Sequence, residues 1–444
     1  MTDPFRSGAF APLLTDLPLT PCDIVDGTLP DIAGRYLRNG PNSPVEPAGP
    51  YVYPIDGDGM LHEITFDGAG GVHYRRSWVR TPMLDAELTA GRALWGTVMM
   101  GLQPLPGAPV SGRKDIPDVN VIEHGGRLLA LAERTLSYNV DAATLQTLGP
   151  DDFDGQYPAG ATAHPKRDPS TGNLVVFAYE FTAPYLSWCE IDASGATLRS
   201  RTAIEGLDFP AMIHDCAITS THVVIPVYPL VFDPLRKVTA EGPPLQWQET
   251  RGTRIAVIDR ADGKVTWFEG PPRWSWHTVN ARSSDEVVIL DVVSYDCFAM
   301  DDRLGNLERM TLDLCTGAFA IETIADRVGE FPRIDDRRIG RDYDLVASAT
   351  NDGPARAPGT FDTIAVTDPL TGATDTWTEA AQPLGEPIHI PGIDEHWAVL
   401  TAAPEGERSH LLIFGSTDVA NGPVTRIALP DRVPAGLHGT WIPE

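Results

Sequence analysis

Short runs of β-forming residues recur along almost the whole chain, and no helical periodicity of comparable extent competes with them. Runs such as 173–181, 286–293 and 410–415 are rich in Val, Ile, Leu and aromatic residues and lie beside turn-forming residues. Several neighbouring runs are joined by short segments such as Gly125-Gly126, which is typical of β-hairpins. The pattern predicts an all-β protein that consists mainly of short antiparallel strands.

The number and spacing of these strands favour a β-propeller, in which each blade is a small antiparallel sheet. No WD or kelch signature repeats in the chain, so a sandwich or a barrel stays an alternative on this pattern alone. No linker divides the sequence. We therefore expect one domain over residues 1–444, in which residues 1–35 form an N-terminal arm that wraps around the domain.

The composition argues against several functional classes. Hydrophobic residues make up 42% of the chain, which is enough for a folded core despite 41 Gly and 40 Pro. The formal net charge of −27 repels phosphate backbones, so we expect no nucleic-acid partner. Five cysteines without C-x-x-C spacing are typical of buried free thiols in a reducing compartment. Since the sequence has neither a signal-peptide pattern nor an apolar run of about 18 residues, it predicts a cytoplasmic protein.

Residues 85–109 interrupt the strand pattern with closely spaced apolar side chains and few charges. One interpretation is a helix in the core. The other is an insertion that forms an apolar cap at a substrate entrance and allows peripheral contact with a membrane, as Met- and Trp-rich patches do. We favour the insertion because Gly and Pro lie on both sides. Its candidate residues for substrate access are Leu94, Trp95, Met99 and Met100.

Four of the eleven histidines stand beside strand-like or apolar segments that also contain Pro, Gly or Asp. They are His164, His214, His277 and His438. They are too far apart in sequence to form a local metal-binding motif. In a propeller, however, the inner strands converge, and one histidine from each of several blades can meet there. Neutral imidazoles suit iron or zinc, so a metal site is one hypothesis and a structural role for each histidine is the other.

Eight short motifs carry a resemblance to a known family. In chain order they are GRYLRNGPN (34–42), DGDGML before His62, AHPKRDP (163–169), IHDCAIT (213–219), HTVNA (277–281), EFPRID (330–335), GEPI (385–388) and PAGLHGTW (434–441). Each motif alone is weak, but together they span nearly the whole chain in the order of the family. The sequence resembles the carotenoid cleavage oxygenases, the non-haem iron family with apocarotenoid, lignostilbene-type and retinal pigment epithelium members.

The resemblance implies a seven-bladed β-propeller with helices and loops over one face, which house the substrate tunnel. It also implies one Fe(II) per chain, held by the four histidines named above, and no catalytic residue beyond this metal centre. Three glutamates outside the ligand set are implied as partners of the imidazoles: Glu133 for His214, Glu330 for His277 and Glu386 for His438. Such partners set the tautomer and orientation of a metal-binding imidazole and raise its basicity.

The reaction implied by the resemblance is oxidative cleavage of a carbon–carbon double bond by O2, which gives two carbonyl products. Val119 stands where the family commonly has a threonine near the iron, and this bears on the access of O2 or water. Ala132 stands where lignostilbene-type members have a lysine that grips a phenol. We therefore favour an apolar conjugated alkene, a carotenoid or apocarotenoid, and we expect no protein partner.

Three alternatives stay open at this point. The substrate is a stilbene or a phenylpropanoid alkene of the isoeugenol type, or the protein is an isomerase that does not cleave its substrate, or it is a propeller that only binds a hydrophobic ligand. Products separate the first from a carotenoid oxygenase, and O2 consumption separates an oxygenase from an isomerase.

Overall fold

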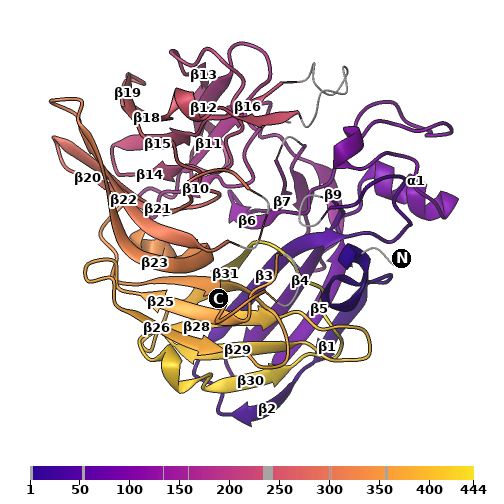
Figure 1. The fold of residues 1–444 in the computed structure, drawn as a ribbon. Coiled ribbons are helices and arrows are strands. Elements are labelled where there is room, and N and C mark those ends of the chain that lie inside the picture. Colours follow the sequence, from indigo (N-terminus) through magenta and orange to yellow (C-terminus); the bar gives the residue numbers. More distant parts are fainter. Residues whose placement is uncertain are drawn as a thin grey trace. The chain divides into compact units, whose positions relative to one another are not determined.

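The computed structural model describes residues 4–52, 56–133, 135–158, 160–233, 244–299, 301, 303–355 and 359–444. The chain divides into two compact units, and each is formed by segments that are far apart in sequence. Unit 1 consists of Met1–Asp152, Asp352–Ile364 and Trp377–Glu444, and unit 2 consists of Phe153–Asn351 and Ala365–Thr376. Strands dominate both units (Figure 1). The expectation of an all-β protein is confirmed.

Unit 1 contains three antiparallel sheets of four or five strands. The first has the order β1-β5-β4-β3-β31 and consists of β1 (Leu17–Pro21), β5 (Val72–Trp78), β4 (Asp58–Asp67), β3 (Ala33–Asn42) and β31 (Gly439–Pro443). The second consists of β6 (Asn120–His124), β7 (Arg127–Leu131), β8 (Tyr138–Val140) and β9 (Thr147–Pro150). The third has the order β2-β30-β29-β28-β27 and consists of β2 (Asp23–Gly27), β30 (Thr425–Ala428), β29 (His410–Gly415), β28 (His396–Thr401) and β27 (Leu384–Ile390).

Unit 2 contains two four-stranded sheets, a two-stranded sheet and most of a seven-stranded sheet. The four-stranded sheets consist of β10 (Lys166–Arg167), β11 (Leu174–Tyr179), β12 (Leu186–Ile191) and β13 (Thr197–Ala203), and of β14 (Ala217–Ile218), β15 (His222–Val227), β18 (Thr253–Asp259) and β19 (Val265–Gly270). The short pair is β16 (Leu230–Phe232) with β17 (Leu245–Trp247). The seven-stranded sheet runs in chain order through β20 (Thr278–Ser283), β21 (Val287–Ser294), β22 (Gly305–Asp313), β23 (Phe319–Arg333), β24 (Val346–Thr350), β25 (Thr363–Thr367) and β26 (Thr374–Thr378). The long β23 pairs with β22 through its first part and with β24 through its last part.

Within a sheet, burial changes from strand to strand. Every residue of β11 and β12 is buried, whereas the neighbouring edge strand β13 is mostly exposed. The interior strands therefore read as continuous apolar runs, because both of their faces are covered. Each unit has its own buried apolar clusters, such as the one that joins β11 and β12 to β15 and β18 in unit 2.

Helical structure is short. The one α-helix assigned in the described ranges, α1 (Pro82–Ala90), begins after Thr81, whose hydroxyl accepts the Leu84 N–H, and ends at Gly91 in the left-handed conformation. The remaining helical turns are 3₁₀: η1 (Pro4–Arg6), η2 (Gly8–Phe10), η3 (Val98–Met100), η4 (Glu249–Arg251), η5 (Asp336–Arg338) and η6 (Val419–Asn421). No helix among the described residues is long and apolar enough to cross a membrane.

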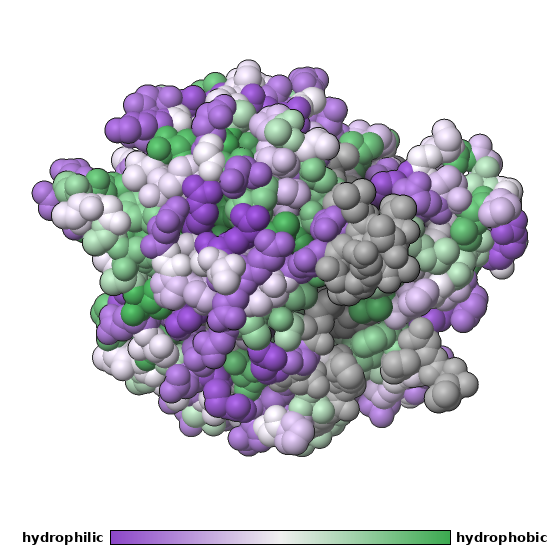
Figure 2. Space-filling model, turned by 45° about the horizontal axis from the view of Figure 1, so that its top comes forward, coloured by the Kyte–Doolittle hydropathy of each residue, from purple (hydrophilic) through white to green (hydrophobic). Residues whose placement is uncertain are grey.

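In the segment 85–109, α1 ends at Ala90, so the expected core helix does not include the apolar residues that follow, and the interpretation as a cap at a substrate entrance stays a prediction. Leu94 and Trp95 are buried. Their backbone N–H groups bind the buried Glu87 carboxylate, and the Trp95 indole N–H binds the Gly112 carbonyl. Met99 and Met100 are exposed, at 47% and 37% of their surface. Any surface patch of this segment therefore contains the two methionines but neither Leu94 nor Trp95. On the face drawn in Figure 2, hydrophilic side chains are interspersed with hydrophobic ones.

The N-terminal residues link two sheets of unit 1. β1 pairs with β5 at the edge of the first sheet, and β2 pairs with β30 at the edge of the third. All five cysteines are free, as the sequence predicts, but only Cys189 and Cys216 are buried, so the expectation of buried thiols is wrong for the other three. Burial raises the pKa of the Cys189 thiol to about 12, so this side chain is a neutral apolar group at physiological pH.

The last strand of the chain is fixed against the first long one. β31 pairs with β3 in antiparallel register, with Leu37 opposite Thr440 (Figure 1). The Trp441 ring packs 5.6 Å from the Phe66 ring and belongs to a buried apolar cluster. Just before the strand, the backbone of Asn39 exchanges hydrogen bonds with Leu437 and His438. A terminus of this kind is held by a ladder and a core contact, so it does not fray.

Two glycines permit this close approach. A Cβ atom at Gly439 would lie 2.3 Å from the Leu37 carbonyl oxygen, and one at Gly436 would lie 2.8 Å from the Arg38 guanidinium. The first contact is with backbone, which cannot move away as a flexible side chain does. A residue with a side chain at position 439 therefore pushes β31 away from β3.

We predict that Gly439→Ala destabilises the protein by about 1–3 kcal/mol, because the new methyl group overpacks the β3–β31 contact. The measurement is the melting temperature of the purified variant. Gly353→Ala is the matched control in unit 1, since no atom lies within 4 Å of its Cβ position, and it should leave the melting temperature nearly unchanged. Equal melting temperatures for the two variants would contradict the prediction.

Candidate metal centre

The four candidate histidines share one position relative to the sheets. Each lies one to three residues before a strand that forms the edge of its sheet: His164 before β10, His214 before β14, His277 before β20 and His438 before β31. His164, His277 and His438 are buried, and His214 is half-buried. Histidines that are unrelated in sequence thus stand at equivalent structural positions.

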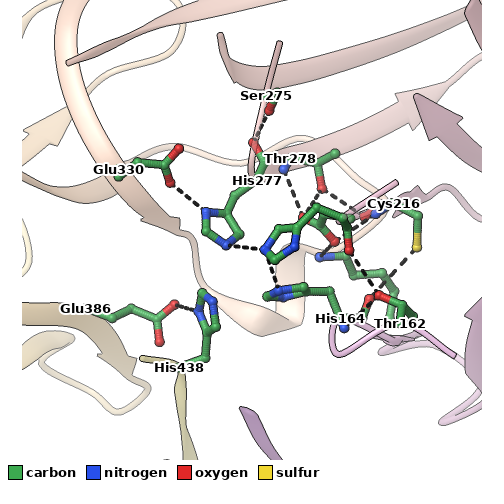
Figure 3. Close-up of polar contacts among 12 residues, drawn as sticks. Thr162, His164, Cys216, Ser275, His277, Thr278, Glu330, Glu386 and His438 are labelled. Carbon is green, nitrogen blue, oxygen red and sulfur yellow. Dashed lines mark hydrogen bonds and ion pairs between the residues drawn. The ribbon is translucent and has the colours of Figure 1, made fainter. Parts of the chain in front are cut away.

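Unit 2 brings three of them together. The Nε2 atom of His214 lies 3.1 Å from Nε2 of His164 and 3.3 Å from Nε2 of His277. The ring centroids of the three imidazoles lie 4.5–5.1 Å apart, and the rings are steeply inclined to one another. Figure 3 shows the nitrogens of His164 and His277 turned toward the ring between them. Three potential ligand atoms therefore converge on one point.

These distances fit a shared metal ion better than hydrogen bonds alone. Two nitrogens bound at about 2.1 Å from one metal and at right angles lie about 3.0 Å apart. A neutral imidazole nitrogen is either a donor or an acceptor. Nε2 of His214 therefore cannot donate to His277 and accept from His164 at the same time. A metal ion accepts all three lone pairs at once. The cluster is thus able to hold a metal that prefers nitrogen ligands, such as iron or zinc.

Glu330 controls the imidazole of His277. Its Oε2 atom lies 2.5 Å from Nδ1 of His277 (Figure 3). Oε2 also accepts the Phe331 N–H, while Oε1 accepts the Tyr295 hydroxyl at 3.0 Å. A carboxylate is only an acceptor, so the proton of the imidazole sits on Nδ1 and the lone pair on Nε2 faces the cluster. Burial and the Glu330 charge raise the pKa of Tyr295 well above its usual range, so the phenol stays a donor.

Unit 1 repeats this arrangement around His438. Nδ1 of His438 lies 2.9 Å from Oε1 of Glu386 (Figure 3), and Oε2 accepts the Gly439 N–H at 2.8 Å. Glu386 belongs to the edge strand β27, which lies beside β31. In both pairs the carboxylate also binds a backbone N–H, and this fixes its own orientation. The two hydrogen bonds join the same glutamate–histidine pairs that the family resemblance implies. The role of these pairs at a metal stays a prediction.

The remaining residues predicted from the sequence are Val119, Glu133, Leu94 and Trp95, and of these Val119 contacts a candidate histidine directly. Val119 contacts His438 through its main chain, because its carbonyl accepts the His438 N–H at 3.0 Å. Its side chain is half-buried. Glu133 follows β7 in unit 1 and is half-buried. Leu94 and Trp95 are enclosed by their own segment, as described above.

Aromatic side chains beside His214 escaped the sequence interpretation. The Trp276 ring lies 5.2 Å from the His214 ring in an edge-on orientation, and it packs against Trp274 and Phe298. Tyr228 completes the group through Trp274. The signal was present in the sequence W-S-W directly before His277. Trp276 therefore presents an apolar ring to His214 and is itself packed against other aromatic rings.

Comparison with known proteins decides the family. Residues 10–443 match the family model described as retinal pigment epithelial membrane protein. The chain belongs to this family. A carotenoid cleavage oxygenase of Mycobacterium tuberculosis (strain CDC 1551 / Oshkosh) is 30% identical over 507 residues, covering 99% of this chain and 98% of that protein. An isoeugenol monooxygenase of Pseudomonas nitroreducens is 28% identical, covering 100% and 98%.

A solved structure agrees with these relatives. The crystal structure of Pseudomonas brassicacearum lignostilbene dioxygenase superposes with a TM-score of 0.90 at 32% identity, covering 100% of this chain and 99% of that chain. The resemblance drawn from the eight motifs is therefore confirmed. Since the curated relatives are named oxygenases, the chain is an enzyme of the oxygenase class.

For this oxygenase we predict that Glu330→Gln weakens metal binding by about 10–100-fold while the fold is retained, because the charged acceptor of the His277 proton is lost. The measurement is a Co(II) titration of the apoprotein. Glu308→Gln removes another buried carboxylate of unit 2, one that binds Arg273, and should leave the affinity unchanged. An affinity of Glu330→Gln within twofold of the wild type would refute the role of the carboxylate.

Proposed function

We propose that this oxygenase uses Fe(II) and O2 to cleave a carbon–carbon double bond of an apolar conjugated alkene into two carbonyl products. The observation that carries the proposal is the convergence of the Nε2 atoms of His164, His214 and His277 at 3.1–3.3 Å. A set of neutral nitrogen ligands is suited to iron and keeps the charge of the ion undiminished.

We infer that His438 is the fourth ligand. Its Nδ1 is bound to Glu386 in the same way as Nδ1 of His277 is bound to Glu330, so its Nε2 carries a lone pair that is available to a metal. The family resemblance assigns Glu133 to His214 as the third such carboxylate. His164 would then be the one ligand without a carboxylate partner.

The fold proposal follows the same resemblance. Seven antiparallel sheets of four or five strands result if β23 is counted as the last strand of one sheet and the first of the next. We propose that they are the blades of one propeller over residues 1–444, with residues 1–35 as its arm. This places both units in a single functional domain.

The residues of the chain would divide the chemistry as follows. When bound, iron would supply activation of O2 next to the alkene. Glu330 and Glu386 hold a proton on Nδ1 of their histidines throughout, so the imidazoles remain neutral nitrogen donors. Trp276 and its aromatic neighbours exclude water beside His214 and offer a surface for a flat apolar substrate. No further catalytic residue is required.

A carotenoid or apocarotenoid is the proposed substrate class. The aromatic rings beside His214 and the buried Ala132 favour a polyene over a phenol that needs a lysine. One relative is named for carotenoid cleavage, another acts on isoeugenol by its name, and the superposed structure is a lignostilbene dioxygenase. A stilbene or phenylpropanoid alkene is therefore the second candidate, supported by the TM-score of 0.90.

Delivery of such a substrate fits the exposed Met99 and Met100. We propose that they allow peripheral contact with a lipid surface near the substrate entrance, while the protein resides in the cytoplasm. Val119, which touches the His438 backbone, is the proposed contact for O2 or water access.

Incubation of the iron-loaded enzyme with carotenoids, apocarotenoids, stilbenes and isoeugenol under ¹⁸O2 tests the reaction. We expect two carbonyl products from a polyene, with ¹⁸O identified by mass spectrometry. Cleavage of only the aromatic alkenes would replace the substrate assignment. Isomerised substrate without O2 consumption would refute the oxygenase reaction for this chain.

We also predict that His438→Ala lowers the affinity for Fe(II) by at least ~10-fold and abolishes cleavage, because one nitrogen ligand is lost. The measurement is bound iron per chain after gel filtration, together with product formation. His396→Ala removes a comparably buried histidine of unit 1 and should retain both properties. A His438→Ala variant with one bound iron and normal turnover would exclude His438 as a ligand.

A further inference from the structure

A single buried carboxylate connects the three histidine-bearing segments of unit 2. Asp215 follows His214 directly and is 4% exposed. Its Oδ1 atom accepts the Cys216 N–H at 2.7 Å and lies 2.8 Å from Nζ of Lys166. Its Oδ2 atom accepts the Thr278 N–H at 2.9 Å and lies 2.8 Å from the Thr278 hydroxyl. Both oxygens thus have two partners each.

These partners are adjacent in sequence to the other two histidines. Lys166 lies two residues after His164, and Thr278 is the residue after His277. The Asp215 side chain therefore binds a side chain from the His164 segment and both the backbone and the side chain of the His277 segment. One carboxylate thus binds three segments whose histidines are separated by 50 and 63 residues in the sequence.

We propose that Asp215 is a positioning residue, whose carboxylate holds the segments of His164, His214 and His277 together so that their Nε2 atoms converge before a metal binds. The inference rests on the proposed metal centre and adds to it a residue that touches neither the metal nor the substrate. It accounts for the close approach of the three imidazoles, in which Nε2 of His214 lies 3.1 Å and 3.3 Å from the other two Nε2 atoms.

Hydrogen bonds of two threonine hydroxyls support the same alignment of the three segments. The Thr162 hydroxyl donates to the His214 carbonyl at 3.1 Å and accepts the His164 N–H at 2.9 Å, so it joins the first two segments. The single proton of the Thr278 hydroxyl is shared between Oδ2 of Asp215 and the Cys216 carbonyl, each at 2.8 Å, and since both acceptors belong to the His214 segment the hydroxyl joins the second and third segments. Asp215 is the one group among these that reaches all three.

The charge of Asp215 is balanced locally. Lys166 lies against it, so the ion pair adds no net charge beside a cluster that must accept a cation. The contribution we assign to Asp215 is therefore geometric: segments that are already ordered lose less conformational freedom when the metal binds, and the affinity rises accordingly.

Co(II) titration of the apoprotein tests this, since Co(II) binds imidazole nitrogen and its absorption reports the ligand set. We expect Asp215→Asn to bind Co(II) at least ~10-fold more weakly than the wild type and with an altered absorption band, because the amide nitrogen cannot accept the Thr278 N–H. The matched control is Asp291→Asn, which removes a fully buried carboxylate of unit 2 whose side chain binds Arg282, Arg309 and the Tyr343 hydroxyl but no residue within two positions of a candidate histidine. It should leave Co(II) affinity and absorption unchanged.

Two further variants separate geometry from charge and from misfolding. Lys166→Met combined with Asp215→Asn removes both charges and should bind as weakly as Asp215→Asn alone. Thr278→Val keeps both charges and should weaken binding about threefold, as expected for one hydrogen bond, so it carries the test if Asp215→Asn does not fold. Circular dichroism identifies folded variants.

The outcomes distinguish this inference from the proposed function. Wild-type protein that binds no Co(II) would refute the metal centre itself. Wild-type binding with an unchanged affinity in folded Asp215→Asn, an equal loss in Asp291→Asn, or full recovery in the double variant would overturn the positioning role and leave the metal centre intact. Unchanged binding by Thr278→Val would also overturn the role.

Discussion

The hydrogen bond from a histidine Nδ1 to a buried glutamate is the interaction on which the rest of the candidate site depends. An imidazole can present either nitrogen, and a carboxylate at Nδ1 removes this choice. In the pairs of His277 with Glu330 and His438 with Glu386, the carboxylate is itself held by a backbone N–H, of Phe331 and of Gly439 respectively. The direction of each Nε2 lone pair is therefore set by main-chain geometry, which side-chain motion does not disturb.

The sheets make this fixed orientation of the imidazoles possible, because each histidine lies one to three residues before an edge strand of its sheet. A residue that precedes an edge strand has one side open to a neighbouring segment, and its backbone is already aligned by the ladder that begins after it. In unit 2 the side chains of Asp215 and Thr162 hold the main chain at or beside the histidines. In unit 1 the same stability comes from the β3–β31 ladder and the Trp441 contact.

Local sequence was sufficient for the fold class but not for the site. Turn residues between runs such as 286–293 and 410–415 predict antiparallel strands, because strand formation leaves a pattern of period and punctuation. The histidines needed the family motifs, since no spacing links His277 to His438. Tyr295 and Asp215 could not be found at all, because their importance lies in contacts with Glu330 and Lys166 that only the fold creates. The apolar pattern around Leu94 likewise did not reveal that the buried Glu87 carboxylate accepts the Leu94 N–H.

A purely structural role for the three histidines of unit 2 is difficult to reconcile with their protonation. If His277 carries its proton on Nδ1, its Nε2 can only accept. Nε2 of His214 can then either donate to that atom or accept an N–H from His164, so the contacts at 3.1 and 3.3 Å are not both hydrogen bonds between neutral imidazoles. A cation at the point where the nitrogens meet would bind all three lone pairs at once, and the contacts of Glu330, Tyr295 and Asp215 hold the arrangement that such a cation needs. The polar network around the cluster thus argues for metal binding independently of the family to which the chain belongs.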